Sequence, residues 1–230
     1  MWNTLTIYRR EMATYCTSPI AYIFFIAMLV VMSVYFFFIA GFFQQQNPDL
    51  RAYFVAFPFA FALLIPAVTM RLWSEEKKSG TVEILMTLPL RSWEVVLGKF
   101  LAGYSIIAVS LILTFSVPLS VSLVLEVDWG MVFASYLGAF VLAAVYVALG
   151  SWASAITTNQ IVALLVAIII SFVLWVMGLP PVMEWLNNML GGIGKPIGWF
   201  SPFYQYQDFG KGIADPVPMI YAASVTAFFL

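Results

Sequence analysis

The residues that could do chemistry are concentrated in one charged stretch, residues 71–99, which reads RLWSEEKKSGTVEILMTLPLRSWEVVLGK. Histidine is absent and Cys16 is the single cysteine, so a Ser-His-Asp triad, histidine metal sites and an internal disulfide are excluded. Gly194-Lys195 is followed by proline and lacks the earlier glycine of a phosphate-binding loop. We therefore expect the charged stretch to bind a partner, and no enzymatic activity is predicted for the chain.

Residues 80–88 of this stretch predict a short amphipathic helix. Ser79-Gly80-Thr81 offers its start, Glu83 sits where it could reach back to a free backbone N–H, and Pro89 ends it after roughly two turns. The apolar positions cover a broad arc and leave a narrow polar strip. Such a helix is too short to cross a membrane, so we expect it to lie flat at the membrane surface or to fit a groove on a partner.

The composition is that of an integral membrane protein. Apolar residues make up 63% of the chain, charged residues make up 9%, and the mean hydropathy is +0.98. Soluble domains carry about 25% charged residues, because they need a polar surface. The net charge of −1 comes without a basic stripe, so nucleic acid is not expected as a partner. The predicted fold is an all-α polytopic membrane protein in a lipid bilayer.

The apolar runs predict one transmembrane domain over residues 1–230, with six membrane helices of which the last is incomplete. Residues 2–18 carry apolar and aromatic side chains three and four apart, which predicts an interfacial helix, with a frayed N-terminal tail as the alternative. The sixth run reaches about 21 Å against a core of about 30 Å, so either the chain stops within that helix or the segment does not cross. The spans are expected at about 20–43, 53–72, 100–125, 131–154, 161–179 and 217–230.

Apart from Arg71 at the edge of the second, the five complete spans contain no charged residue, which counts against a proton- or ion-coupled carrier. The second span contains two prolines, and we expect it to bend where neighbouring groups meet the freed carbonyls. The fourth carries small residues four apart, a pattern that lets helix backbones approach closely. This packing face favours self-association of the chain.

Residues 182–190 predict a helix about 13 Å long, which can dip into the membrane or lie on it but cannot cross. The following residues, 191–216, are rich in glycine, proline and aromatics and predict a non-helical segment. Of the ten Lys and Arg residues, seven lie on the side of the charged stretch. This bias places the charged stretch and the N-terminus in the cytoplasm, so that residues 180–216 face outward.

Three segments resemble the ABC-2 type permeases, which are membrane subunits of ABC transporters. EKKSGTVEIL at 76–85, followed by Pro89 and by WEVVLGK at 93–99, resembles the segment between the second and third membrane helices of that family. SAITTNQIVA at 154–163 is similar to its turn between helices four and five, and residues 201–215 are similar to the region before helix six. The resemblance covers nearly the whole chain and is closest to the gliding-motility-associated permeases.

The resemblance implies that residues 80–88 are a coupling helix, which docks on a cytoplasmic ABC ATPase subunit. Residues 2–18 would be the connecting helix, and residues 180–190 the outward re-entrant helix. The outward helix would present Val182, Trp185, Leu186 and Met189. The residues implied in the ATPase contact are Glu76, Gly80, Thr81, Val82, Glu83, Leu85, Met86 and Pro89.

The same resemblance implies an exporter in the bacterial inner membrane, built from two permease copies and two ATPases. ATP and Mg²⁺ would bind to the ATPase, and this chain would hold no cofactor and no metal. An extracytoplasmic auxiliary subunit is a further partner that the resemblance allows. The cargo is not determined, because family membership sets the coupling scheme only.

Two other classes of function stay open on the sequence: a channel or carrier that works without ATP, and a structural anchor for another complex. Residues 75–78 also fit an ordinary solvated run of charges, and Glu83 fits a helix-start residue alone. Asn159-Gln160 could simply cap the fifth span, and the aromatic residues at 199–206 fit an interface belt. An associated ATPase would separate the permease from its alternatives.

Overall fold

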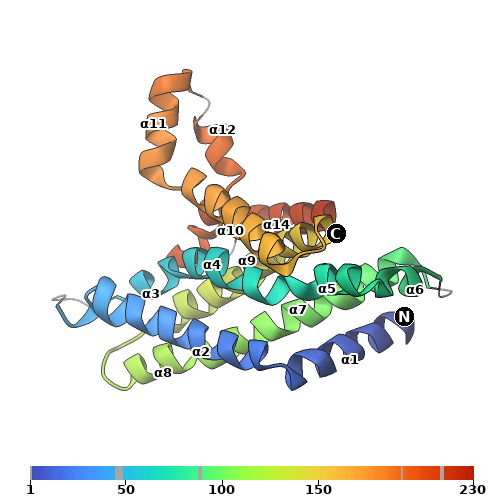
Figure 1. Ribbon diagram of the computed structural model, residues 1–230. Helices are drawn as coiled ribbons and strands as arrows, with labels where there is room; N and C mark the ends of the chain where they lie inside the picture. The colour runs from blue at the N-terminus through green and yellow to red at the C-terminus, as the bar shows by residue number, and fades with distance from the viewer. Residues whose placement is uncertain (1, 45–48, 88–89, 193, 213–214) are drawn as a thin grey trace.

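The computed structural model describes residues 2–44, 49–87, 90–192, 194–212 and 215–230, and these residues form helices without any strand. Five helical stretches are long and apolar enough to cross a membrane, which confirms a multi-pass all-α protein. They form an elongated bundle, and a helical hairpin projects from its flank (Figure 1). The five stretches are Pro19–Ile39, Arg51–Ser79, Ser92–Ser122, Trp129–Ile156 and Gln160–Met177.

The N-terminal helix α1 (Trp2–Thr17) forms where the interfacial helix was predicted, and the alternative of a frayed tail is wrong. The first span consists of α2 (Pro19–Val34) and one π-helical turn, η1 (Tyr35–Ile39), so its helix ends before the expected boundary at 43. A 3-10 turn, η2 (Phe42–Gln44), follows Gly41, whose φ of 66° favours glycine.

The second span is longer than expected because its helix continues through charged residues. It consists of α3 (Arg51–Val55), α4 (Phe57–Thr69) and α5 (Arg71–Ser79), so the expected end at 72 lies inside the helical stretch. Only the hydrocarbon core requires apolar residues, and Glu and Lys are good helix formers beyond it. Gly80 ends α5 with a φ of 71°. The next helix is α6 (Thr81–Thr87).

The third span consists of α7 (Ser92–Thr114) and α8 (Ser116–Ser122), with a break at Phe115. Pro118 has no N–H with which to bond the carbonyl of Thr114. The hydroxyl of Tyr53 donates to that carbonyl over 3.1 Å. A neighbouring span therefore satisfies the group that proline leaves free, as a region without water requires.

The fourth and fifth spans are the single helices α9 (Trp129–Ile156) and α10 (Gln160–Met177). Asp128 caps α9 and Asn159 caps α10, and each side chain accepts hydrogen bonds from backbone amides in the first turn of its helix. The capping role expected at Asn159 is therefore confirmed.

Beyond the fifth span, α11 (Pro180–Leu190) and α12 (Gly194–Trp199) form the projecting hairpin. The expectation of a non-helical segment after α11 is wrong for the described residues. Prolines that suggested a break instead occupy the first turns of helices, where a missing N–H has no cost. The helices that follow α12 are α13 (Pro202–Tyr206), the 3-10 turn η3 (Phe209–Lys211) and α14 (Pro216–Phe229).

The fourth span, α9, is the centre of the core, and α4, α7, α10 and α14 all pack against it. Most of its small residues are buried inside the chain and Ala144 is half-buried, so the close packing that they predicted is mainly intramolecular and supplies little surface for a second copy. At Gly150 a Cβ would overlap the side chain of Thr69. The buried small residues are Ala139, Ala143, Ala148, Gly150 and Ser154.

We expect Gly150→Ala to destabilise the protein by about 1 to 3 kcal/mol, because the added methyl group overpacks the contact between α9 and α4. The measurement is the thermal unfolding midpoint of the purified protein in detergent. Gly103→Ala in α7 is the control, since a Cβ there would meet Leu72 and Val147 at 3.5 Å, an ordinary contact. Equal effects of the two substitutions would contradict this packing.

Candidate functional site

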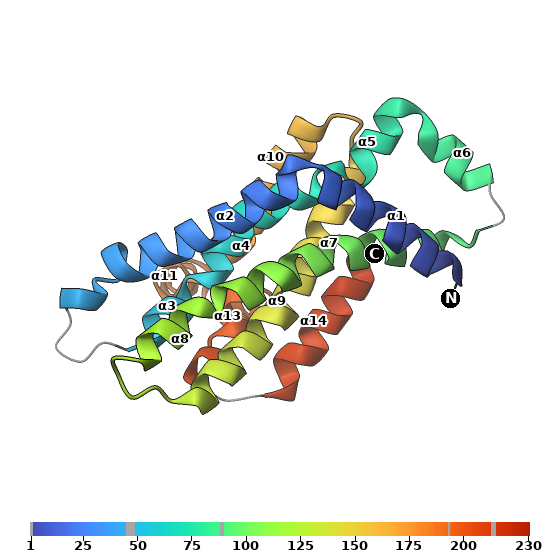
Figure 2. The same ribbon diagram turned by 90° about the horizontal axis from the view of Figure 1, so that it is seen from below.

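The helix α6 carries most of the residues implied in the ATPase contact, and it extends beyond the bundle at the end of α5 (Figure 2). The hydroxyl oxygens of Ser79 and Thr81 lie 2.9 Å apart across the turn at Gly80. Thr81 also donates to the carbonyl of Glu76 over 3.3 Å. These bonds and the left-handed glycine give α6 a defined direction relative to α5.

A buried cluster of ions joins α5 to α1 and α7. Lys99 of α7 is 1% exposed, and its Nζ lies 3.1 Å from Glu11 of α1 and 3.0 Å from Glu76 of α5. It also donates to the carbonyl of Leu72 over 2.7 Å. A lysine ammonium has three protons, so these acceptors use all of them. Lys99 therefore ties three helices together at one point.

Arg10 completes this ion cluster from α1. Its Nη2 lies 2.7 Å from the Oε1 of Glu11 and 2.5 Å from the Oε1 of Glu76, so both carboxylates are shared by two cations. Desolvation acts to lower the pKa of Arg10, but the hydrogen bonds and charges of the two carboxylates outweigh it and raise that pKa. The cluster holds two charges of each sign and is neutral as a whole.

A second polar contact, centred on Ser154, joins α5 to α9. The hydroxyl oxygen of Ser154 accepts hydrogen bonds from the backbone amides of Trp73 and Ser74, at 3.0 and 3.1 Å. It also donates to the carbonyl of Met70 over 2.7 Å. The first amides of a helix have no acceptor within that helix, so Ser154 satisfies the start of α5.

Arg71 attaches the junction of α1 and α2 to the second span. Its guanidinium donates to the Oγ of Ser18 over 2.9 Å and to the carbonyl of Thr14 over 3.3 Å. It also lies 4.8 Å from the ring centroid of Tyr15, within the range of a cation–π contact. These contacts hold α1 in place independently of the ion cluster.

The structure divides the residues implied in the ATPase contact into two groups. The carboxylate of Glu76 is turned inward to Arg10 and Lys99, where it serves the packing of α5. Gly80 forms the turn, and Pro89 lies outside the described residues. The other implied residues lie on α6, and Thr81 and Glu83 among them are exposed. The residues on α6 are Thr81, Val82, Glu83, Leu85 and Met86.

The residues implied in the outward helix lie on α11, in the projecting hairpin and well away from α6 (Figure 1). Trp185 and Met189 are exposed, and Val182 and Leu186 are half-buried. The two sets of predicted residues therefore occupy separate parts of the molecule.

Sequence reasoning gave no role to Glu11, treated Ser154 as a small packing residue of the fourth span, and treated Lys99 as a flanking charge at the end of WEVVLGK. The one available signal was the presence of opposite charges near span ends on the same predicted side of the membrane. The choice of partner among those charges depends on how α1, α5 and α7 cross. Spacing along the chain does not provide this information.

Comparison with protein-family models matches residues 5–214 to a family described as ABC-2 family transporter protein. The matched residues include the ion cluster, α6 and the projecting hairpin. The comparison with curated proteins found no match. The family match agrees with the resemblance drawn from the charged stretch, but it does not identify a subgroup of the family.

The ion cluster predicts that Lys99→Met lowers the free energy of unfolding by about 2 to 4 kcal/mol. Two carboxylates lose a buried counter-charge, and the carbonyl of Leu72 loses its donor. The measurement is unfolding of the purified protein in detergent at neutral pH. Lys78→Met, at an exposed position on α5, is the control and should have little effect.

The double variant Lys99→Met, Glu76→Gln tests the pairing itself. It should recover part of the stability lost in Lys99→Met, because one unbalanced negative charge is removed. If the two substitutions are simply additive, Lys99 and Glu76 do not stabilise one another.

Proposed function

Because the chain belongs to the ABC-2 family of transporter proteins, we propose that it is the membrane permease of an ATP-driven exporter, driven by a separate cytoplasmic ABC ATPase that docks on α6. One observation carries the proposal: α6 stands at the outer end of α5, which is itself bonded to α1, α7 and α9. A displacement of α6 would therefore reach three other helices at once.

In the proposed coupling step, α6 and α5 move as one body when the ATPases close on ATP. The ion cluster carries α1 and α7 along with α5, and Ser154 transmits the motion of the start of α5 to α9. Rearrangement of these helices would open the translocation path to the two sides of the membrane in turn.

In this proposal ATP and Mg²⁺ bind to the partner ATPase, and this chain holds no cofactor. The proposed location is the bacterial inner membrane with α1 and α6 in the cytoplasm, supported by the seven-to-three distribution of Lys and Arg. An extracytoplasmic auxiliary subunit would meet the projecting hairpin. Membership of the gliding-motility-associated subgroup is proposed on the resemblance of residues 76–99.

We also propose that a second permease copy packs against α10 and the projecting hairpin. Only 17% of the most apolar part of α10 is buried, against 67% for α9. Lipid alone would satisfy the apolar face of α10, but Gly191 and Gly192 after α11 are exposed, and polar backbone at membrane depth must meet protein or water. The exposed apolar residues of α10 include Leu165, Ile169 and Phe172.

The coupling proposal predicts that Leu85→Asp weakens ATPase binding roughly tenfold or more, because a carboxylate on the apolar arc of α6 would lose its hydration in a partner groove. The measurements are the amount of cognate ATPase that co-purifies and ATP turnover in lipid vesicles. Thr87→Asp is the matched control, since Thr87 is exposed on the same helix.

Membrane insertion of both variants is checked by alkaline extraction of the membranes, and their folding by size-exclusion chromatography in detergent. If Leu85→Asp leaves assembly and turnover unchanged, α6 does not couple the two subunits. A channel or an anchor that works without ATP would then be favoured.

The dimer proposal predicts disulfide cross-linking of Ile169→Cys in a Cys16→Ser background, because Ile169 is 60% exposed on α10. Mild oxidation of membranes should give a covalent dimer on a non-reducing gel. Ile112→Cys on α7 is the control, because Ile112 is 65% exposed and lies away from the proposed seam. A purified complex with the mass of a single permease copy would remove the proposal.

A further inference from the structure

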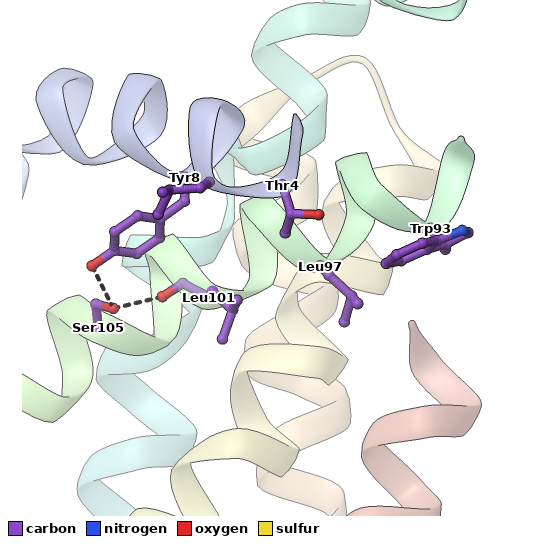
Figure 3. Close-up of a pocket in the computed structure, with 7 residues that line it drawn as sticks. Thr4, Tyr8, Trp93, Leu97, Leu101 and Ser105 are labelled. Atoms are coloured by element: carbon purple, nitrogen blue, oxygen red, sulfur yellow. Dashed lines mark hydrogen bonds between the residues drawn. The ribbon is translucent and has the colours of Figure 1, made fainter. Parts of the chain in front are cut away.

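A groove of about 640 Å³ lies between α1 and α7 (Figure 3). This volume is in the usual range of about 300 to 1,000 Å³ for small-molecule sites. Its apolar wall on α7 is open, because the three large side chains there are 36 to 49% exposed. The α7 wall is a stripe of residues four apart: Trp93, Leu97, Leu101 and Ser105.

The opposite wall belongs to α1 and is partly polar. The hydroxyls of Tyr8 and Ser105 lie 3.1 Å apart and close one end of the groove (Figure 3). Ser105 donates its proton to the carbonyl of Leu101, so Tyr8 is the donor in this pair. The Oγ1 of Thr4 is buried without a hydrogen-bond partner. Threonine has two common rotamers in a helix, so rotation can turn this hydroxyl toward a ligand.

Arg9 does not line the groove itself but adds a positive charge on the neighbouring turn of α1. It lies one turn from Leu5 on the same face of α1, and it is exposed without an ion pair in the described part of the chain. The acidic residue nearest in sequence to the α7 wall, Glu94, is already engaged. It accepts the side-chain amide of Asn3 over 3.1 Å and the backbone amide of Arg91 over 3.2 Å.

We propose that this groove binds one acyl chain of an anionic glycerophospholipid, with the lipid phosphate paired to Arg9 and an ester oxygen bonded to Thr4. The walls belong to a membrane span and to the helix that leads into the first span, so the groove opens on lipid. Leu5, Leu97 and Leu101 form an apolar surface that matches a hydrocarbon chain, so the charge of the headgroup decides which lipid is held. A lipid bound here would bridge α1 and α7 next to the ion cluster.

The test uses the full chain in phosphatidylcholine vesicles that contain a small fraction of phosphatidylglycerol with a photoactivatable acyl chain. After illumination, labelled residues are mapped by mass spectrometry in the presence of unlabelled phosphatidylglycerol or phosphatidylcholine. We expect label on the groove walls that phosphatidylglycerol removes and phosphatidylcholine does not. Ile112, which is 65% exposed on α7 outside the groove, is the reference for bulk lipid. Equal competition by both lipids at the groove would overturn the proposal.

Two variants sharpen this test. Arg9→Gln should lower groove labelling about fivefold, the usual effect of one basic residue on attraction to an anionic lipid. Lys78→Gln, which removes another exposed cation, should leave the labelling unchanged. Leu97→Trp should fill the groove and abolish the label.

Wild-type labelling of Arg9→Gln would overturn the proposal even if Leu97→Trp fails to fold, because Arg9 is exposed and its replacement leaves the packing of α1 intact. The labelling requires neither ATP nor an ATPase. Its failure would therefore be distinct from a failure of the coupling proposal.

Discussion

The burial of Lys99 constrains the whole end of the bundle where α1, α5 and α7 meet. A buried ammonium without partners costs several kcal/mol, and the acceptors that satisfy this one come from α1 and α5. The three helices therefore have one relative arrangement that satisfies the charge. Arg10 strengthens this requirement, because Glu11 and Glu76 each serve two cations.

Backbone groups impose a similar constraint inside the bundle, where no water is present to satisfy them. Two of the breaks in the long spans, between α4 and α5 and between α7 and α8, are placed where a neighbouring span supplies the missing partner. The carbonyl freed by Pro118 receives the hydroxyl of Tyr53, and the first amides of α5 are met by Ser154. The second span is thereby tied to the third and to the fourth at its irregular points, which favours motion of these spans as a group.

The sequence predicts the helices of this protein better than it predicts their contacts. Apolar length and local breakers are properties of the chain itself, so the five long helices and the short helix after Gly80 follow from them. Charge density does not locate the end of the helix that contains the second span, because it marks the edge of the hydrocarbon core and does not end a helix. The partners of Lys99 and the neighbour of Gly150 depend on how helices far apart in the sequence cross. The spacing of residues in a single sequence does not determine that crossing.

The pairing inside the ion cluster bears on where partner recognition can lie. Because the Oε1 of Glu76 is held by Arg10 and Lys99, recruiting this carboxylate to an ATPase would take a partner from the buried ammonium of Lys99 and from the half-exposed guanidinium of Arg10. Recognition is therefore better assigned to α6, while α5 supplies stiffness. In the proposed coupling, the movement caused by ATPase docking on α6 is expected to reach the opposite side of the core. There α10 packs on both α4 and α9 and keeps most of its surface uncovered. A shift of α9 relative to α4 would move α10, the helix at the proposed seam, without breaking a buried ion pair.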